Sequence, residues 1–405
     1  MRRLLLATAL ALAGLPARAE PDSFAAVERG RALATAGDCV ACHTVPGRQP
    51  FSGGRALETP FGNINSANLT PDPELGIGAW TADDFYRAMH EGNRPGGTHL
   101  YPAFPYPYYT RVTRPDSDAI FAFLRSLPST PNRVDRDTLP FPFDIRASMI
   151  AWNAINFTPG EYQPDPKRSE QFNRGGYLVE GLGHCGACHT PMNVLGGSKD
   201  GKHLQGNQIQ AWIAPNITND LRTGLGSWSP DEIVEYLRAG RNAKSAASGP
   251  MAEVVMFSTA LMPEADLRAM AVYLKERGAA GPSASTAIPA SDGRMTQGQA
   301  IYSDTCKACH TAAGEGIDRM FPALANSQVV QQTDPTTLIR VVITGTRAAA
   351  TLSAPTGPAM PALGWRLSDE QVASVLTYVR NAWGNTAPAV GVGDVAKVRS
   401  RVGAQ

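Results

Sequence analysis

Three short runs of the chain share the spacing Cys-x-x-Cys-His. They are Cys39, Cys42 and His43; Cys185, Cys188 and His189; and Cys306, Cys309 and His310, and together they use all 6 cysteines. This spacing is the attachment sequence for c-type haem: both thiols add to the vinyl groups of one porphyrin, and the histidine becomes the proximal iron ligand. The sequence therefore predicts three covalently attached haems c.

Two other kinds of site use a similar spacing. Structural zinc sites pair two Cys-x-x-Cys knuckles at short range, whereas these runs lie far apart in the chain. A thioredoxin-like redox pair does not call for histidine at the next position. We therefore favour haem over both alternatives.

The rest of the composition bounds location and partners. With 37 basic and 36 acidic residues and no basic stripe, the chain has no signature of nucleic-acid binding. Residues 1–19 predict a signal peptide, because Arg2 and Arg3 precede a short apolar stretch and a small-x-small cleavage site before Glu20. We expect a periplasmic protein at the outer face of the cytoplasmic membrane, with any membrane association peripheral or made through a partner.

A repeated helical pattern surrounds the three runs. Each run follows a predicted helix, at residues 29–37, 174–183 and 297–304. Each repeat then closes with an amphipathic helix, marked by Ile120, Phe121, Phe123 and Leu124; by Leu267, Met270, Ala271 and Leu274; and by Val372, Val375, Leu376 and Val379. Thr81 with Asp84, Ser229 with Glu232 and Ser368 with Gln371 are predicted helix caps. The pattern matches an all-α protein of three tandem class I cytochrome c domains, each with one covalently bound haem.

Composition suggests the boundaries between these domains. A proline-rich stretch cannot form a continuous helix and predicts an extended strap, and a Gly/Ala/Ser/Pro-rich stretch predicts a flexible hinge. For the end of the chain, a frayed terminus is the default, and a membrane or partner contact is the alternative. The expected order is signal peptide 1–19, domain 1 at 20–127, strap 128–168, domain 2 at 169–278, linker 279–293, domain 3 at 294–385 and C-terminal tail 386–405.

Three runs carry a family resemblance: residues 181–191, residues 249–255 and residues 363–369. In these runs the chain resembles the three-haem cytochrome c subunit of bacterial membrane-associated dehydrogenases. The resemblance extends over nearly the whole mature chain. The resemblance implies a periplasmic electron carrier. It would accept electrons from a catalytic subunit (a quinoprotein, a flavoprotein or a molybdenum enzyme) and pass them to membrane ubiquinone or another cytochrome.

Haem iron in such domains usually takes methionine as its sixth ligand. Domain 2 offers Met251 in the family's Gly-Pro-Met-Ala-Glu-Val-Val context, with Met256 and Met262 as rivals that we interpret as core or loop residues. Domain 3 offers Met360, which precedes a proline in a predicted loop. The resemblance implies that Met251 and Met360 are iron ligands.

Domain 1 departs from the family pattern, because Phe104 stands where the family has methionine. Phenylalanine cannot bind iron. His99, His90 and Met89 lie nearby, and three outcomes stay open: His99 replaces the thioether, Met89 reaches from another direction, or the iron is five-coordinate behind Phe104.

We expect an electron-transfer subunit without substrate chemistry of its own, since the chain has no dinucleotide fingerprint, nucleophile elbow or metalloprotease helix. The alternatives are a peroxidase-like multi-haem enzyme and a redox or gas sensor, both of which would use an open haem in domain 1.

Overall fold

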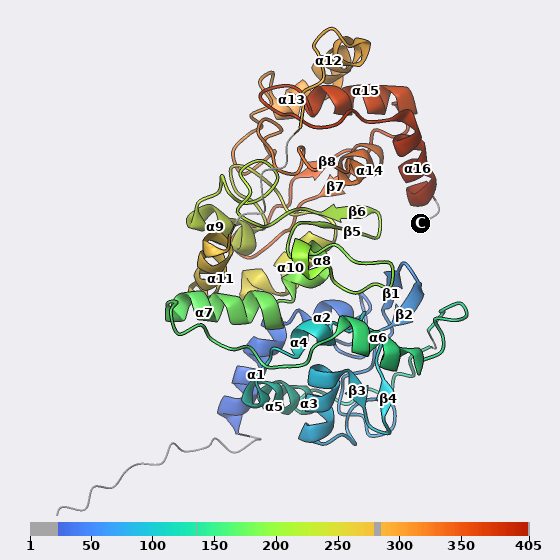
Figure 1. Cartoon of the computed structure of the whole chain (residues 1–405), viewed down its shortest axis with the longest axis vertical. Helices are drawn as coiled ribbons and strands as arrows, with labels where there is room; N and C mark the ends of the chain where they lie inside the picture. The colour runs from blue at the N-terminus through green and yellow to red at the C-terminus, as the bar shows by residue number, and fades with distance from the viewer. Residues whose placement is uncertain (1–22, 136, 279–284, 404–405) are drawn as a thin grey trace, which may run out of the picture.

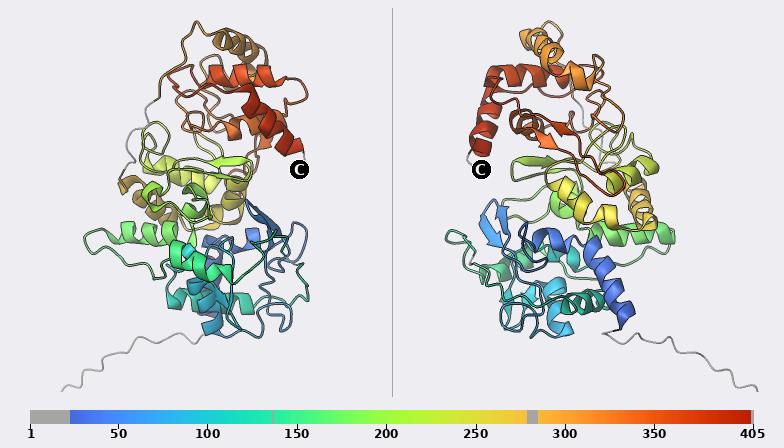
Figure 2. Two further views of the ribbon diagram at one scale, coloured as in Figure 1. Left: turned by 45° about the vertical axis from the view of Figure 1, so that its right-hand side comes forward. Right: turned by 180° about the vertical axis from the view of Figure 1, so that it is seen from behind.

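The computed structural model describes residues 23–135, 137–278 and 285–403. The described residues are helix-rich, and 42% of them are helical. Three helical units follow one another along the long axis, from unit 1 (residues 24–125, blue to teal) through unit 2 (170–276, green to brown) to unit 3 (293–379, orange to red) (Figures 1 and 2). The predicted signal peptide lies outside the described residues, as does part of the predicted linker.

Each unit begins and ends with a helix, as the sequence predicts. The opening helices are α1 (Phe24–Ala36), α7 (Glu170–Tyr177), which continues as the π-helix η1 (Leu178–Leu182), and α12 (Gly293–Thr305). The closing helices are α5 (Arg114–Arg125), α11 (Glu264–Glu276) and α15 (Asp369–Val379). Each opening helix packs against the closing helix of its own unit.

A glycine lies where each pair of helices crosses. A Cβ atom on Gly30, Gly175 or Gly298 would overlap the backbone carbonyl oxygen of Ala119, Ala269 or Ser374, respectively. The residue before the glycine adds a polar contact in every unit. Arg29 Nε donates to Asp116 Oδ1 at 2.9 Å, Arg174 Nε donates to Asp266 Oδ1 at 2.8 Å, and Gln297 Oε1 accepts from Ser374 Oγ at 2.8 Å. The three units thus share the same helix crossing, with a glycine at the contact and a polar contact from the residue before it.

Between these helices each unit carries the haem-attachment run and a middle helix. The runs form short helices, α2 (Cys39–Cys42), α8 (Cys185–His189) and α13 (Lys307–His310), and the middle helices are α3 (Ala82–Glu91), α9 (Pro230–Ala239) and α14 (Thr336–Thr344). Capping boxes start α3, α9 and α15, so all three predicted caps are confirmed. The strands form four antiparallel pairs, β1–β2 (Ala56–Thr59, Gly62–Asn65), β3–β4 (Asn93–Arg94, Thr98–His99), β5–β6 (Asn207–Ile209, Trp212–Ala214) and β7–β8 (Thr346–Arg347, Ala359–Met360). Further helices of the units are α4 (Tyr106–Tyr109), η2 (Asp200–Lys202), α10 (Pro250–Phe257) and η3 (Thr259–Leu261), and α6 (Ser148–Asn156) and α16 (Val392–Gly403) lie outside the units.

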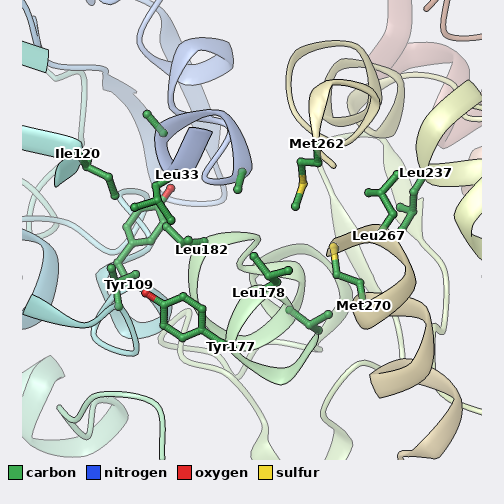
Figure 3. Close-up of a cluster of buried hydrophobic side chains, with 14 of the residues drawn as sticks. Leu33, Tyr109, Ile120, Tyr177, Leu178, Leu182, Leu237, Met262, Leu267 and Met270 are labelled. Atoms are coloured by element: carbon green, nitrogen blue, oxygen red, sulfur yellow. The ribbon is translucent and has the colours of Figure 1, made fainter. Parts of the chain in front are cut away.

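Units 1 and 2 share one hydrophobic core, whereas unit 3 has its own. Figure 3 shows Leu33, Tyr109 and Ile120 of unit 1 connected through Leu178 and Leu182 to Met262, Leu267 and Met270 of unit 2. The separate cluster of unit 3 surrounds Tyr302, Ile339 and Val372. The first two units therefore form one packed body.

Two segments differ from the sequence-based expectation. The strap is not extended throughout, because α6 (Ser148–Asn156) forms within it and is fixed by Trp152 Nε1 donating to the Leu195 carbonyl at 2.7 Å. The tail, as far as it is described, is not frayed. It forms α16 (Val392–Gly403), which buries Val395 and Val398 against α14 and α15. Among the described helices, none is long and apolar enough to cross a bilayer.

The glycine crossing predicts opposite effects for two glycines of α12. Gly298→Ala should lower the free energy of unfolding by about 1–3 kcal/mol, because the methyl group forces α12 away from α15. Gly293→Ala meets nothing within 4 Å, so it should be neutral or stabilise by up to about 1 kcal/mol. Thermal unfolding of both variants checks this. Equal effects would contradict the role of the crossing.

Candidate functional site

The histidine of each attachment run is held in the same way. The Nδ1 atoms of His43, His189 and His310 lie 2.7, 2.7 and 3.0 Å from the backbone carbonyl oxygens of Ala67, Pro215 and Pro322. Since a carbonyl oxygen can only accept, Nδ1 must carry the proton. The other ring nitrogen, Nε2, is then the lone-pair nitrogen that binds a metal.

Burial keeps these side chains neutral. It lowers the pKa of all three histidines, although the carbonyl bond opposes the shift. It raises the pKa of Cys39 and Cys185 to about 12 and that of Cys42, Cys188 and Cys306 to about 11. All six cysteines are free thiols. Each run thus presents two thiols and one imidazole, the groups that covalent haem attachment needs.

A buried donor in unit 2 also fits a bound porphyrin. Trp228 Nε1 is buried and has no hydrogen-bond partner among the described residues. Buried polar groups in native structures almost always have a partner, so an acceptor on a bound group, such as a haem carboxylate, would satisfy it.

The predicted sixth ligands lie in comparable places in units 2 and 3. Met251 is half-buried at the start of α10 and packs against the shared core, and Met360 is half-buried in β8 against the core of unit 3. Of the rivals, Met262 is buried in the shared core (Figure 3), and Met256 packs against a small apolar cluster that includes Ala252 and Val255, as Met251 also does.

Backbone bonds establish that Phe104 matches Met251. Leu100 N donates to the Gly92 carbonyl and Ala247 N donates to the Gly240 carbonyl, both at 2.7 Å and both just after the middle helix. Phe104 and Met251 each lie four residues further on. Phe104 packs against the shared core, with its ring 5.3 Å from that of Tyr109. The position of unit 1 that corresponds to Met251 therefore holds an apolar ring.

The three other candidates of unit 1 differ in how they are engaged. Met89 is buried in the core, and Ser117 Oγ lies 3.9 Å from its sulfur. His90 stacks on Tyr86, with ring centroids 4.9 Å apart. His99 pairs with Asn93 in the β3–β4 hairpin, and its buried Nδ1 has no hydrogen-bond partner among the described residues. The described residues therefore leave Nδ1 of His99 without a partner, whereas Nδ1 of His90 lies 3.4 Å from Thr110 Oγ1.

The structure also brings together residues that the sequence did not single out. Asp38 and His184 precede the first two attachment runs, and both have left-handed backbone, with φ of 51° and 35°. The pKa of Cys188 is raised by burial and, in smaller part, by Cys42 and Asp38, so the two runs lie close together. Burial and then Glu253 raise the pKa of Asp38 to about 8, and Arg55 opposes the shift. The single sequence carried no signal for these long-range neighbours.

Comparison with known proteins decides the family. The family model described as Cytochrome c matches residues 295–383. The chain is 40% identical to the gluconate 2-dehydrogenase cytochrome c subunit of Pantoea cypripedii, over 98% of this chain and 95% of the relative. It is 38% identical to the cytochrome c subunit of the quinone alcohol dehydrogenase of Gluconobacter oxydans, over 95% of this chain and 84% of the relative. The chain belongs to this family of dehydrogenase cytochrome c subunits.

A third relative shows the same likeness with a different dehydrogenase. The fructose dehydrogenase cytochrome subunit of Gluconobacter japonicus is 36% identical, over 98% of this chain and 88% of the relative. Membership confirms the resemblance to cytochrome c subunits of membrane-associated dehydrogenases. It also supports haem c as the cofactor of this cytochrome.

Proposed function

We propose that the chain is a periplasmic electron-transfer subunit with three tandem class I cytochrome c domains, each holding one covalent haem c. Each domain would carry one attachment run: Cys39, Cys42 and His43; Cys185, Cys188 and His189; and Cys306, Cys309 and His310. The observation that carries this is the threefold recurrence of one arrangement, in which two thiols stand beside an imidazole whose Nδ1 is bonded to a backbone carbonyl.

The chain's own residues would perform three tasks. The thiols fix each porphyrin, and the carbonyl of Ala67, Pro215 or Pro322 orients the proximal ring and raises the basicity of its Nε2. Met251 and Met360 would each supply a thioether to an iron, which would favour the reduced metal and raise the reduction potential. Haem iron supplies reversible one-electron transfer.

The names of the relatives support the proposed partners. Those proteins are cytochrome subunits of gluconate, alcohol and fructose dehydrogenases. By analogy, a catalytic dehydrogenase subunit would be the electron donor. Ubiquinone or a downstream cytochrome would be the acceptor, and association with the membrane would be peripheral.

A second function is favoured by Phe104 alone. If no residue replaces the thioether, the haem of unit 1 is open and can react with peroxide or bind a gas, as in a peroxidase-like enzyme or a redox or gas sensor. Turnover of peroxide by the purified, haem-loaded chain would support this alternative.

The haem count tests the central proposal. The exported protein should keep its haem absorbance after denaturation and acid-acetone extraction, and a pyridine haemochrome assay should give three haems per chain. Mass spectrometry of tryptic peptides should place one haem on each attachment run. Two or fewer haems per chain would contradict the proposal.

The two methionines should act independently, because they belong to different units. Met360→Ala should leave three haems attached but remove about half of the weak red absorption band of Met–Fe(III) coordination, and Met251→Ala should remove the other half. Met262→Ala is the matched control. If the control removes the band and Met251→Ala does not, the ligand of unit 2 is misassigned.

The haem of unit 1 should differ spectroscopically from the other two. Electron paramagnetic resonance of the oxidised protein and carbon monoxide titration of the reduced protein distinguish the outcomes. A high-spin signal with one carbon monoxide bound indicates an open iron. A low-spin bis-histidine signal that disappears in His99→Ala indicates His99 as the ligand. Phe104→Met should convert either form into a methionine-ligated spectrum. Three methionine-ligated haems in the unmodified protein would contradict the interpretation of Phe104.

A further inference from the structure

Units 1 and 2 meet through a reciprocal contact at their attachment runs. The helix that follows Phe104, α4, packs against η1, which leads into the attachment run of unit 2. The helix that carries Met251, α10, packs against α2, the attachment run of unit 1. The segment that faces the haem of one unit is therefore also the neighbour of the other unit's attachment run.

Arg55 joins the two sides of the second contact. Its Nη1 donates to the Ala41 carbonyl, inside the attachment run of unit 1, at 2.6 Å. Its Nη2 donates to Glu253 on α10, at 2.8 Å to Oε2 and 3.1 Å to Oε1. One guanidinium thus bonds an attachment run and, at the same time, the helix turn that begins with Met251.

Arg55 is a cation placed near two carboxyl groups, those of Asp38 and Glu253. Asp38 is buried, and Asp38, Arg55 and Glu253 are close enough to act on the pKa of Cys42. The side chains of Arg55 and Glu253 are 29% and 40% exposed, so the pair is only partly screened by water. Without Arg55, two carboxyl groups would remain beside each other with no cation between them.

A second bond ties the far end of α10 to unit 1. Ser258 Oγ, at the C-terminal cap of α10, donates to the Ala36 carbonyl at 3.3 Å. The helix is therefore attached to unit 1 at both ends, and Arg55 fixes the end that bears Met251.

The mirror contact is built from aromatic rings instead of an ion pair. Tyr109 donates its hydroxyl to the Gly37 carbonyl at 2.9 Å, and its ring packs edge-on against His184 at 5.4 Å between centroids. The ion pair is thus specific to the side that carries a methionine.

We propose that Arg55 is a positioning residue of unit 1 that holds Met251 in place in unit 2. The attachment of haem in one unit is thereby coupled to axial ligation in the next. This inference rests on the proposed assignment of Met251 as an iron ligand.

The test uses the full haem-loaded chain in a Met360→Ala background, so that only unit 2 contributes the Met–Fe(III) band. Oxidised protein is titrated with imidazole, which competes with the thioether for the iron. In Arg55→Gln the band should disappear at about tenfold lower imidazole, although the substitution lies in another unit. Glu253→Gln, which keeps the side-chain shape, should act in the same direction.

Glu264→Gln is the matched control. Glu264 lies in α11 of unit 2, and its Oε2 is 2.8 Å from Arg238 Nη1, a pair of similar exposure that does not contact unit 1. In the Met360→Ala background, Glu264→Gln should lose the band at the same imidazole concentration as Met360→Ala alone. The double variant Arg55→Gln/Glu253→Gln should shift no further than the larger single effect, because both substitutions remove the same contact.

The possible outcomes distinguish a failure of the coupling through Arg55 from a failure of the assignment of Met251 as an iron ligand. If the band of Met251→Ala/Met360→Ala is as strong as that of Met360→Ala alone, the assignment of Met251 is wrong. If that variant loses the band but Arg55→Gln and Glu253→Gln both titrate like Glu264→Gln, the assignment stands and the coupling through Arg55 is overturned.

Discussion

The close crossing of the opening and closing helices is the constraint on which each unit depends. A side chain at Gly30, Gly175 or Gly298 would occupy the space of a backbone carbonyl on the closing helix. Because the attachment run follows within a few residues of each opening helix, the crossing also fixes where the thiols emerge. The carbonyl that orients each histidine belongs to a residue further along the same unit: Ala67, Pro215 or Pro322. The placement of each attachment run thus depends on one backbone contact.

Local chemistry made much of this predictable from the sequence. The attachment spacing, the helix caps at Thr81, Ser229 and Ser368 and the apolar stripes of the closing helices are all set by residues within a turn or two of each other. Helices α6 and α16 were missed for a different reason. Tertiary contacts stabilise them: Trp152 bonds the Leu195 carbonyl, and Val395 and Val398 pack on neighbouring helices. Composition alone, rich in proline or poor in aromatic residues, favoured irregular structure there.

The three units repeat in sequence, but they do not pack together in an equivalent way. All three units use the same crossing and the same orientation of histidine, yet units 1 and 2 share a core and unit 3 keeps its own. In the first two units a left-handed residue, Asp38 or His184, precedes the attachment run, whereas in unit 3 the opening helix continues to Thr305, directly before Cys306. A left-handed residue turns the run sharply out of its helix, and the two turned runs meet. Sequence similarity could reveal the repeat but not this pairing, because the partners are far apart in the chain.

The segments that face the attachment runs carry two roles at once. In unit 2 the segment begins with Met251 and bonds unit 1 through Glu253; in unit 1 it contains Phe104 and reaches unit 2 through Tyr109 and His184. A substitution at Met251 or Phe104 therefore falls in a segment that also forms the contact between the two units. The exchange of methionine for Phe104 accompanies an aromatic contact, and the retained Met251 accompanies an ion pair. The proposed iron ligands and the packing between units 1 and 2 consequently depend on the same segments of this chain.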